Sequence, residues 1–133
     1  MARFEAKLRR IFIERMIREI KRRNRLLVED LQTNIGRTLQ RGGLLIEARA
    51  KEILTENGHI VTGNLKRSIN TQVIRTGADR LYAEVGSFLF YAPFVEALPD
   101  GGYLFPAAEQ QFPAVTRLLL DEGLRPALVR WAR

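Results

Sequence analysis

The chain begins with a long run free of helix-breaking residues, and this run constrains the fold more than any other feature. Residues 3–41 contain no proline and a single glycine, Gly36. Apolar side chains recur through it, mostly three or four positions apart, at Ile13, Ile17, Ile20, Leu27, Leu31, Ile35 and Leu39. This spacing places them on one face of an α-helix, with charged residues on the other positions. The run therefore predicts a long amphipathic helix.

Glycines divide the sequence that follows. Gly42 and Gly43 are predicted to weaken or break the helix, because glycine has a low helix propensity. Apolar residues at helical spacing then resume between positions 45 and 54 and stop at Asn57-Gly58, a typical helix terminator. We therefore assign residues 1–57 to one long, basic, amphipathic helical region that is weakened or broken at 42–43.

The length of this helix implies a partner. A straight helix over residues 3–41 is about 57 Å long at roughly 1.5 Å per residue. A chain of 133 residues forms one compact domain with a diameter of only roughly 36 Å. The helix should overhang its own domain, and its apolar face then needs another surface to cover it. Another copy of the chain is the simplest such surface, so we expect an oligomer.

Shorter patterns follow the long helix. Thr62 suits the N-cap of one helical turn over residues 64–68, and Gly63 permits a tight entry into it. Apolar and polar side chains then alternate over residues 69–74 and again over 81–85. This alternation predicts two strands with one buried face each, paired antiparallel through a short turn.

Prolines and glycines organise the remainder. Pro93 suits the first turn of a short helix, residues 103–105 are long enough for a third short strand, and Pro106 should open the last helix. Interruptions of that helix are expected at Pro113, Gly123 and Pro126. The order predicts a single α+β domain: a long N-terminal helix, a small antiparallel sheet with an embedded short helix, and a C-terminal helix. Residues 58–133 form its small α+β body.

The net charge of +7 belongs to one segment. Residues 1–25 hold ten Lys and Arg against three Asp and Glu, whereas the rest of the chain holds equal numbers of both. This segment is therefore the one candidate for an electrostatic contact surface. Its candidate contact residues are Arg9, Arg10, Arg15, Arg18, Lys21, Arg22, Arg23 and Arg25.

The sequence gives little support for catalysis. His59 is the single histidine, Ser68 and Ser87 are the only serines, and no nucleophile-elbow pattern surrounds either serine. There is no cysteine, and one histidine does not supply a metal site. No glycine-rich phosphate loop is present. We predict a protein that is not an enzyme, with no metal and no cofactor, and no apolar run is long enough to cross a membrane.

Four short segments occur in a distinctive order. They are Thr62-Gly63-Asn64-Leu65-Lys66-Arg67-Ser68-Ile69, Val85-Gly86-Ser87, Tyr91-Ala92-Pro93-Phe94-Val95-Glu96 and Phe105-Pro106-Ala107-Ala108. In this order the chain resembles the tail-component or neck proteins of tailed bacteriophages, which join the DNA-filled head to the tail. The resemblance assigns structural roles to Thr62, Gly63, Leu65, Ser68, Gly86, Tyr91, Glu96 and Pro106.

The resemblance implies a structural virion protein. Such a protein forms a homo-oligomeric ring, six- or twelve-fold, at the head–tail junction, in the neck or at the top of the tail. Its expected partners are other copies of itself and the adjacent head-connector and tail proteins, and DNA passes through its channel. It would be assembled in the host cytoplasm and located in the virion. The resemblance predicts that the protein completes the tail by its shape, matching the symmetry of neighbouring rings around the DNA path, and that it catalyses no reaction.

Two interpretations of the basic helix stay open. Its arginines could contact DNA phosphates without sequence preference; otherwise they dock on acidic surfaces of neighbouring rings or form a solvated face. A small DNA-binding protein that uses this helix directly is the alternative function, and a small nuclease is a third. The aromatic residues Phe88, Phe90, Tyr91 and Phe94 are expected in the core or in a subunit interface. They lack the interleaved basic residues of a base-stacking platform.

Overall fold

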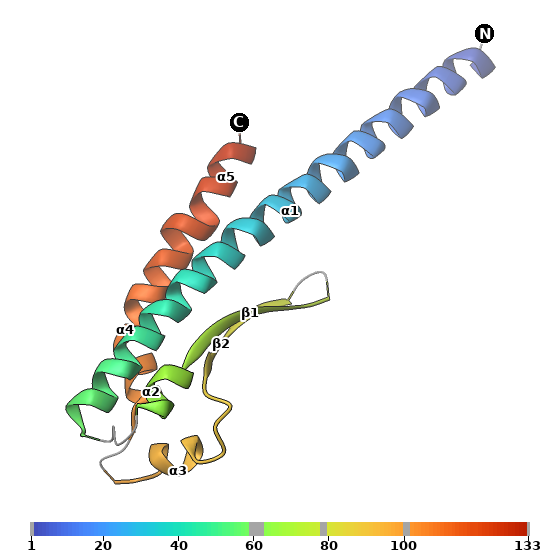
Figure 1. Cartoon of the computed structure of the whole chain (residues 1–133). Coiled ribbons are helices and arrows are strands. Elements are labelled where there is room, and N and C mark those ends of the chain that lie inside the picture. The colour runs from blue at the N-terminus through green and yellow to red at the C-terminus, as the bar shows by residue number, and fades with distance from the viewer. Residues whose placement is uncertain (1, 59–62, 78–79, 100–101, 133) are drawn as a thin grey trace.

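The computed structural model describes residues 2–58, 63–77, 80–99 and 102–132, with side chains from Arg9 onward. It has the predicted α+β architecture, in which helices predominate (Figure 1). The elements in order are α1 (Ala2–Glu56), α2 (Asn64–Ser68), β1 (Asn70–Thr76), β2 (Arg80–Gly86), α3 (Ala92–Glu96), α4 (Leu104–Leu118), the π-helical segment η1 (Leu119–Leu124) and α5 (Arg125–Trp131).

Helix α1 runs without interruption for 55 residues, which is about 80 Å at roughly 1.5 Å per residue. The expected break at Gly42-Gly43 is therefore wrong, and packing explains why. A Cβ atom on Gly42 would lie 2.8 Å from Val115 Cγ1 of α4, and one on Gly43 would overlap the Thr71 side chain of β1. The two glycines let neighbouring elements approach α1 closely, and these contacts offset the roughly 1 kcal/mol that each glycine costs in a helix.

Helix α1 is the centre of the structure. The rod formed by α4, η1 and α5 packs antiparallel along one side of it, and the β1–β2 hairpin lies along another (Figure 1). Ion pairs mark the antiparallel direction, since Arg41 pairs with Glu122 and Arg130 pairs with Asp30. Beyond the end of α5, α1 continues alone toward the N-terminus (Figure 1). The predicted overhang is confirmed.

The C-terminal helical region is also less broken than expected. Gly123 does not end it, because η1 is a π-helical segment that leads directly into α5 at Arg125. A Cβ on Gly123 would come within 2.9 Å of Thr38 Oγ1, so this glycine again permits close approach to α1. Pro126 lies in the first turn of α5, directly after the π-helical segment, and does not end the helical region. Pro113 lies inside α4 without ending it.

Strands β1 and β2 pair antiparallel in a two-stranded sheet, with Thr71 opposite Val85 and Gln72 opposite Glu84. Burial alternates as predicted, with Thr71 and Val85 half-buried and Gln72 and Glu84 exposed. The third strand expected over residues 103–105 is wrong. Leu104 and Phe105 form the first turn of α4 instead, because a carboxylate described below holds the backbone N–H groups at that position.

Candidate interaction surfaces

Leu65, Ile69, Ala92, Tyr103 and Ala107 come from separate parts of the chain but belong to one buried cluster. They bring α2, α3 and the start of α4 together at the C-terminal end of α1. There they pack against Ala50, Ile53 and Leu54. The segments that carry the family resemblance thus build the core of the body.

Glu96, at the end of α3, caps helix α4. One carboxylate oxygen accepts hydrogen bonds from the backbone N–H groups of Tyr103 (2.9 Å) and Leu104 (3.0 Å), and the other accepts one from Phe105 (3.0 Å). A carboxylate at this position satisfies N–H groups that have no partner within the helix and interacts favourably with the helix dipole. Burial, followed by the charge of Glu96, raises the pKa of Tyr103. Glu96 therefore has a structural role.

The two serines also act structurally. Ser68 Oγ lies 2.5 Å from Ser87 Oγ and donates to the Leu65 carbonyl oxygen at 2.7 Å. The Ser87 hydroxyl accepts the Leu89 N–H at 3.1 Å, which leaves its own proton for Ser68. This arrangement joins the end of α2 to the end of β2. Both hydroxyls take part in these hydrogen bonds. His59, the histidine that a serine–histidine arrangement would need, lies outside the described residues.

The remaining motif positions differ in what they require. Thr62, proposed as the N-cap of α2, lies outside the described residues. Gly63 occupies the cap position, with a φ of 75° that favours glycine. Tyr91 packs half-buried against the core cluster, and Pro106 lies in the first turn of α4. Among the described residues, no atom lies within 4 Å of the position that a Cβ on Gly86 would take, so packing against them does not require glycine there.

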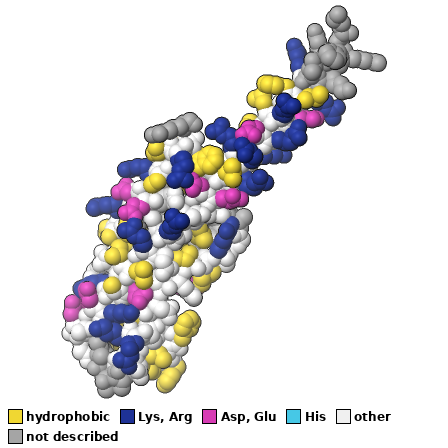
Figure 2. Space-filling model, turned by 45° about the horizontal axis from the view of Figure 1, so that its top comes forward, with side chains coloured by type: hydrophobic (Ala, Val, Ile, Leu, Met, Phe, Trp, Pro, Cys, Tyr) yellow, Lys and Arg dark blue, Asp and Glu magenta, His cyan; other side chains and the backbone are white. Residues whose placement is uncertain are grey.

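The overhanging part of α1, residues 2–25, is here called the arm. All eight candidate basic residues lie on it and are exposed, and Figure 2 shows Lys and Arg side chains close together along it as well as over the body. Arg15, Arg18, Arg22 and Arg25 follow one another at spacings of three and four, so they form a row along one side of the helix.

A second row on the arm is apolar. Ile13, Met16, Ile17 and Ile20 repeat at helical spacing, and each is between 46% and 53% exposed. Their spacing continues the apolar face that α1 buries further along the body. The same face of α1 is buried in the body, but on the arm nothing in the described part of the chain covers Ile13, Met16 or Ile17.

Few of the arm's charges are paired. Arg10 forms an ion pair with Glu14, and Arg22 forms one with Glu19, which lowers the pKa of Glu19 through a hydrogen bond and a charge interaction. Within the described residues no ion pair involves the other candidate cations, namely Arg9, Arg15, Arg18, Lys21, Arg23 and Arg25. These side chains are available to an anionic partner.

The end of α5 fixes the base of the arm. Asp30 accepts hydrogen bonds from the guanidinium of Arg130 (2.7 Å) and from the indole Nε1–H of Trp131 (3.1 Å). Trp131 also lines a shallow hollow of about 250 Å³ with Ile20 and Leu27. Support for α1 from the rest of the chain therefore ends near Ile20.

A second uncovered apolar surface lies at the opposite end of the molecule, around α3 (Figures 1 and 2). Phe88 is 86% exposed, Phe90 83%, Phe94 71% and Phe105 68%. These four residues are here called the aromatic surface. Large aromatic side chains at such exposure are typical of interaction sites. The expectation that they lie in the core is wrong for Phe88, Phe90 and Phe94, so a subunit interface stays the open prediction.

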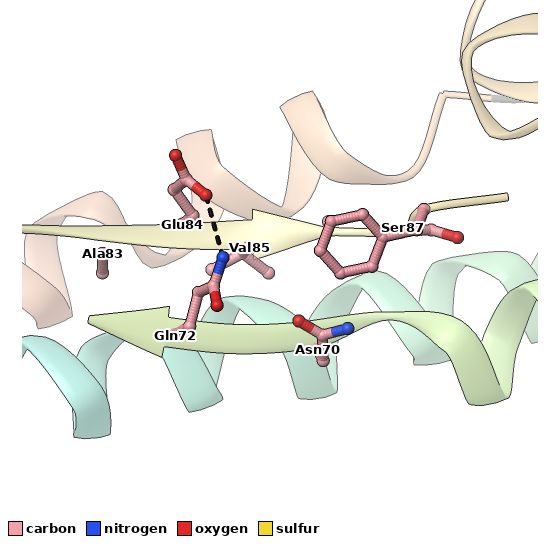
Figure 3. A pocket seen from close by; sticks show the side chains of 8 residues that line it. Asn70, Gln72, Ala83, Glu84, Val85 and Ser87 are labelled. Atoms are coloured by element: carbon pink, nitrogen blue, oxygen red, sulfur yellow. Dashed lines mark hydrogen bonds between the residues drawn. The ribbon is translucent and has the colours of Figure 1, made fainter. Parts of the chain in front are cut away.

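Beside this surface, the outer face of the sheet is polar and hollowed. A cavity of about 430 Å³ is lined by Asn70, Gln72, Glu84, Phe88 and their neighbours. Gln72 Nε2 donates to Glu84 Oε2 at 3.1 Å across the two strands (Figure 3). The cavity holds a single ionisable side chain, Glu84, and so lacks the paired groups of an acid–base site.

Across residues 2–58, 63–77, 80–99 and 102–132, no cluster of three His, Asp or Glu side chains is arranged to hold a metal. Over the same residues, no helix combines the length and apolarity required to span a membrane. In comparisons with known proteins, no protein-family model, curated protein or solved structure matches this chain.

Proposed function

We propose that this chain is a structural protein of a tailed-bacteriophage particle and is not an enzyme. It would assemble as a homo-oligomeric ring at the head–tail junction, completing the tail and leaving a channel for DNA. The observation that carries this proposal is the arm, which exposes Ile13, Met16 and Ile17 in a row beyond the reach of Trp131, with no cover from the described part of its own chain. A protomer with such a surface is incomplete alone.

The body supports the same proposal. Its motif residues join α2, α3 and α4 around one core, and Glu96 and the two serines add hydrogen bonds between these elements. Such hydrogen bonds make the end of the body rigid, which suits a ring wall. The neighbours in the particle would be the head-connector proteins above and the tail proteins below, and the protein would reside in the virion after assembly in the host cytoplasm.

The decisive experiment locates the subunit in the particle. Purified virus particles are imaged, and the α1 rod with its hairpin is sought as a repeated density at the junction of head and tail. The proposal predicts a closed ring of identical subunits around the DNA path. If mass spectrometry of the same preparation finds no trace of this protein in the purified particles, the proposal is wrong.

One observation favours a second function. Arg9, Arg15, Lys21, Arg23 and Arg25 are exposed and form no ion pair within the described residues, so the arm could bind DNA phosphates directly. That contact would be independent of sequence and would weaken steeply with salt. A small DNA-binding protein therefore remains the alternative to the ring.

Two matched variants separate the functions. The first replaces Arg15 and Arg25 with Gln, and the control replaces Arg37 and Arg117, which are exposed cations outside the arm. The DNA-binding function predicts micromolar or tighter duplex binding at about 150 mM salt, and the first variant alone should weaken it, because each lost cation removes a phosphate contact. The ring function predicts weak duplex binding for the wild type and for both variants. It also predicts that the protein is found as a large discrete oligomer or bound in the particle.

A further inference from the structure

The arm and the aromatic surface cannot cover each other within one copy. From Ile20 to Leu54, α1 is an unbroken helix about 50 Å long at roughly 1.5 Å per residue. The arm projects from one end of this rod, and the aromatic surface lies beside its other end (Figure 1). Each is an apolar surface without a partner in the described part of the chain, so any contact between them joins two copies.

Their charges are opposite. Residues 1–25 carry a net charge of +7, whereas residues 81–116 contain no Lys or Arg at all. This second segment supplies the whole aromatic surface, and its charged residues are Glu84, Glu96, Asp100 and Glu109. Glu84 and Glu109 are exposed. The aromatic surface thus belongs to a segment whose charged residues are all acidic, and the apolar stripe belongs to a segment that is mostly basic.

The alternative pairing of two arms is opposed by charge. It would bring two helices of strongly positive charge side by side, and like charges at such distances repel. Two aromatic surfaces facing one another would bring their acidic neighbours together in the same way. The mixed contact alone satisfies both the apolar burial and the charges.

We propose that the arm of one copy docks on the aromatic surface of the next copy. The contact buries Ile13, Met16 and Ile17 against Phe88, Phe90 and Phe94, with the basic row beside acidic residues. Such a head-to-tail contact uses two different patches, so it closes into a ring when the rotation between copies allows closure. This inference rests on the proposed function and specifies how subunits of the ring meet.

Two double variants test it. The arm variant carries Ile13→Asn and Ile17→Asn, and the aromatic variant carries Phe88→Ser and Phe94→Ser. The control carries Leu128→Asn and Val129→Asn, two α5 residues that are each 51% exposed and belong to neither surface. All six side chains are at least 46% exposed, so each variant should keep the helical circular dichroism spectrum of the wild type.

Analytical ultracentrifugation gives the readout. The wild type and the control should form oligomers, while the arm variant and the aromatic variant should each remain monomeric. Mixing the two monomeric variants should give a one-to-one dimer, because each retains the surface that the other has lost. A mixture that stays monomeric overturns the proposal, and so does a wild type that is monomeric at every concentration. An aromatic variant that still forms dimers indicates arm-to-arm pairing and overturns it as well.

Salt provides a second readout. The mixed dimer should weaken as salt rises, since opposite charges are screened, whereas a contact between two like-charged arms would strengthen. The outcome is separable from the proposed function. If particles contain the ring but the variants do not pair, this contact is wrong and the function stands. If the variants pair but particles lack the protein, the function is wrong and the contact stands.

Discussion

The two halves of α1 share one pattern and have different surroundings. In the body, Leu54 is fully buried and Gly42 and Gly43 bring α4 and β1 against the helix. In the arm, Ile17 is 46% exposed and no neighbour in the described part of the chain covers it. Helical periodicity therefore predicts which face of a helix is apolar but not which chain covers that face. In the body, other elements of the same chain cover it; on the arm, we propose that another copy does.

The largest expected effect tests this difference directly. Leu54→Ala removes side-chain atoms from the centre of the core and should lower the free energy of unfolding by about 3 kcal/mol. Ile17→Ala makes a similar change on the same helix and should alter it by less than about 0.5 kcal/mol in dilute monomer. Urea denaturation of both variants measures the two values. Equal losses would mean that the arm packs on its own body.

Loss of the Glu96 cap should come next. Glu96→Ala leaves the backbone N–H groups of Tyr103, Leu104 and Phe105 without their acceptor, and we expect a loss of about 2 kcal/mol. Glu96→Gln keeps one acceptor oxygen and should lose clearly less. Glu14→Ala on the arm is the matched control. The Glu14 carboxylate pairs with the exposed Arg10, so this substitution should leave the free energy of unfolding in urea almost unchanged.

The glycines of α1 offer a third contrast. Gly43→Leu forces a side chain against Thr71, and overpacking should cost about 1.5 kcal/mol. Gly36→Ala adds a methyl group where nothing lies within 4 Å, so the better helix propensity should stabilise the protein by about 0.5 to 1 kcal/mol. Thermal melts should therefore move in opposite directions. Stabilisation by both changes would show that α1 is not clamped at Gly43.

The smallest effect concerns pH. Burial raises the pKa of Glu47, but hydrogen bonds from Lys51 and Thr71 outweigh it and hold the pKa below its ordinary value of 4.5. The stabilisation is therefore present above that ordinary value and is lost as the pH falls through the lower pKa of the folded protein. Glu47→Gln should cost about 1 kcal/mol at neutral pH and progressively less below pH 4.5. A constant difference across that range would exclude this linkage.

The sequence predicted the elements better than their interruptions. The long helix, the hairpin and the short helix at Pro93 are present as expected because each depends on local periodicity and turn chemistry. The breaks predicted at Gly42-Gly43 and Gly123 are wrong because contacts with Val115, Thr71 and Thr38 outweigh propensity. Such contacts join residues far apart in sequence, so no local pattern reveals them.

The candidate surfaces were predicted to different degrees. Charge counting placed the basic residues on one segment, and all eight are exposed there. The exposure of Phe88, Phe90 and Phe94 could not be predicted from their apolar character, which suits a core equally well. The resemblance assigned Glu96 a structural role but did not predict the cap that it forms on α4. Its recognition requires knowing that α3 folds back on α4.

The clamp at Gly42 gives the arm a mechanical consequence. Because α1 is one rod, a tilt of about 5° where α4 grips it would move a point roughly 30 residues away by about 4 Å, at roughly 1.5 Å of helix rise per residue. The direction in which the arm reaches is therefore governed by the contacts that hold α1 in the body, from Gly42 to the Asp30–Trp131 contact at the base of the arm. In a closed assembly built through the arm, the curvature and hence the number of subunits would be determined by residues that touch no neighbouring copy.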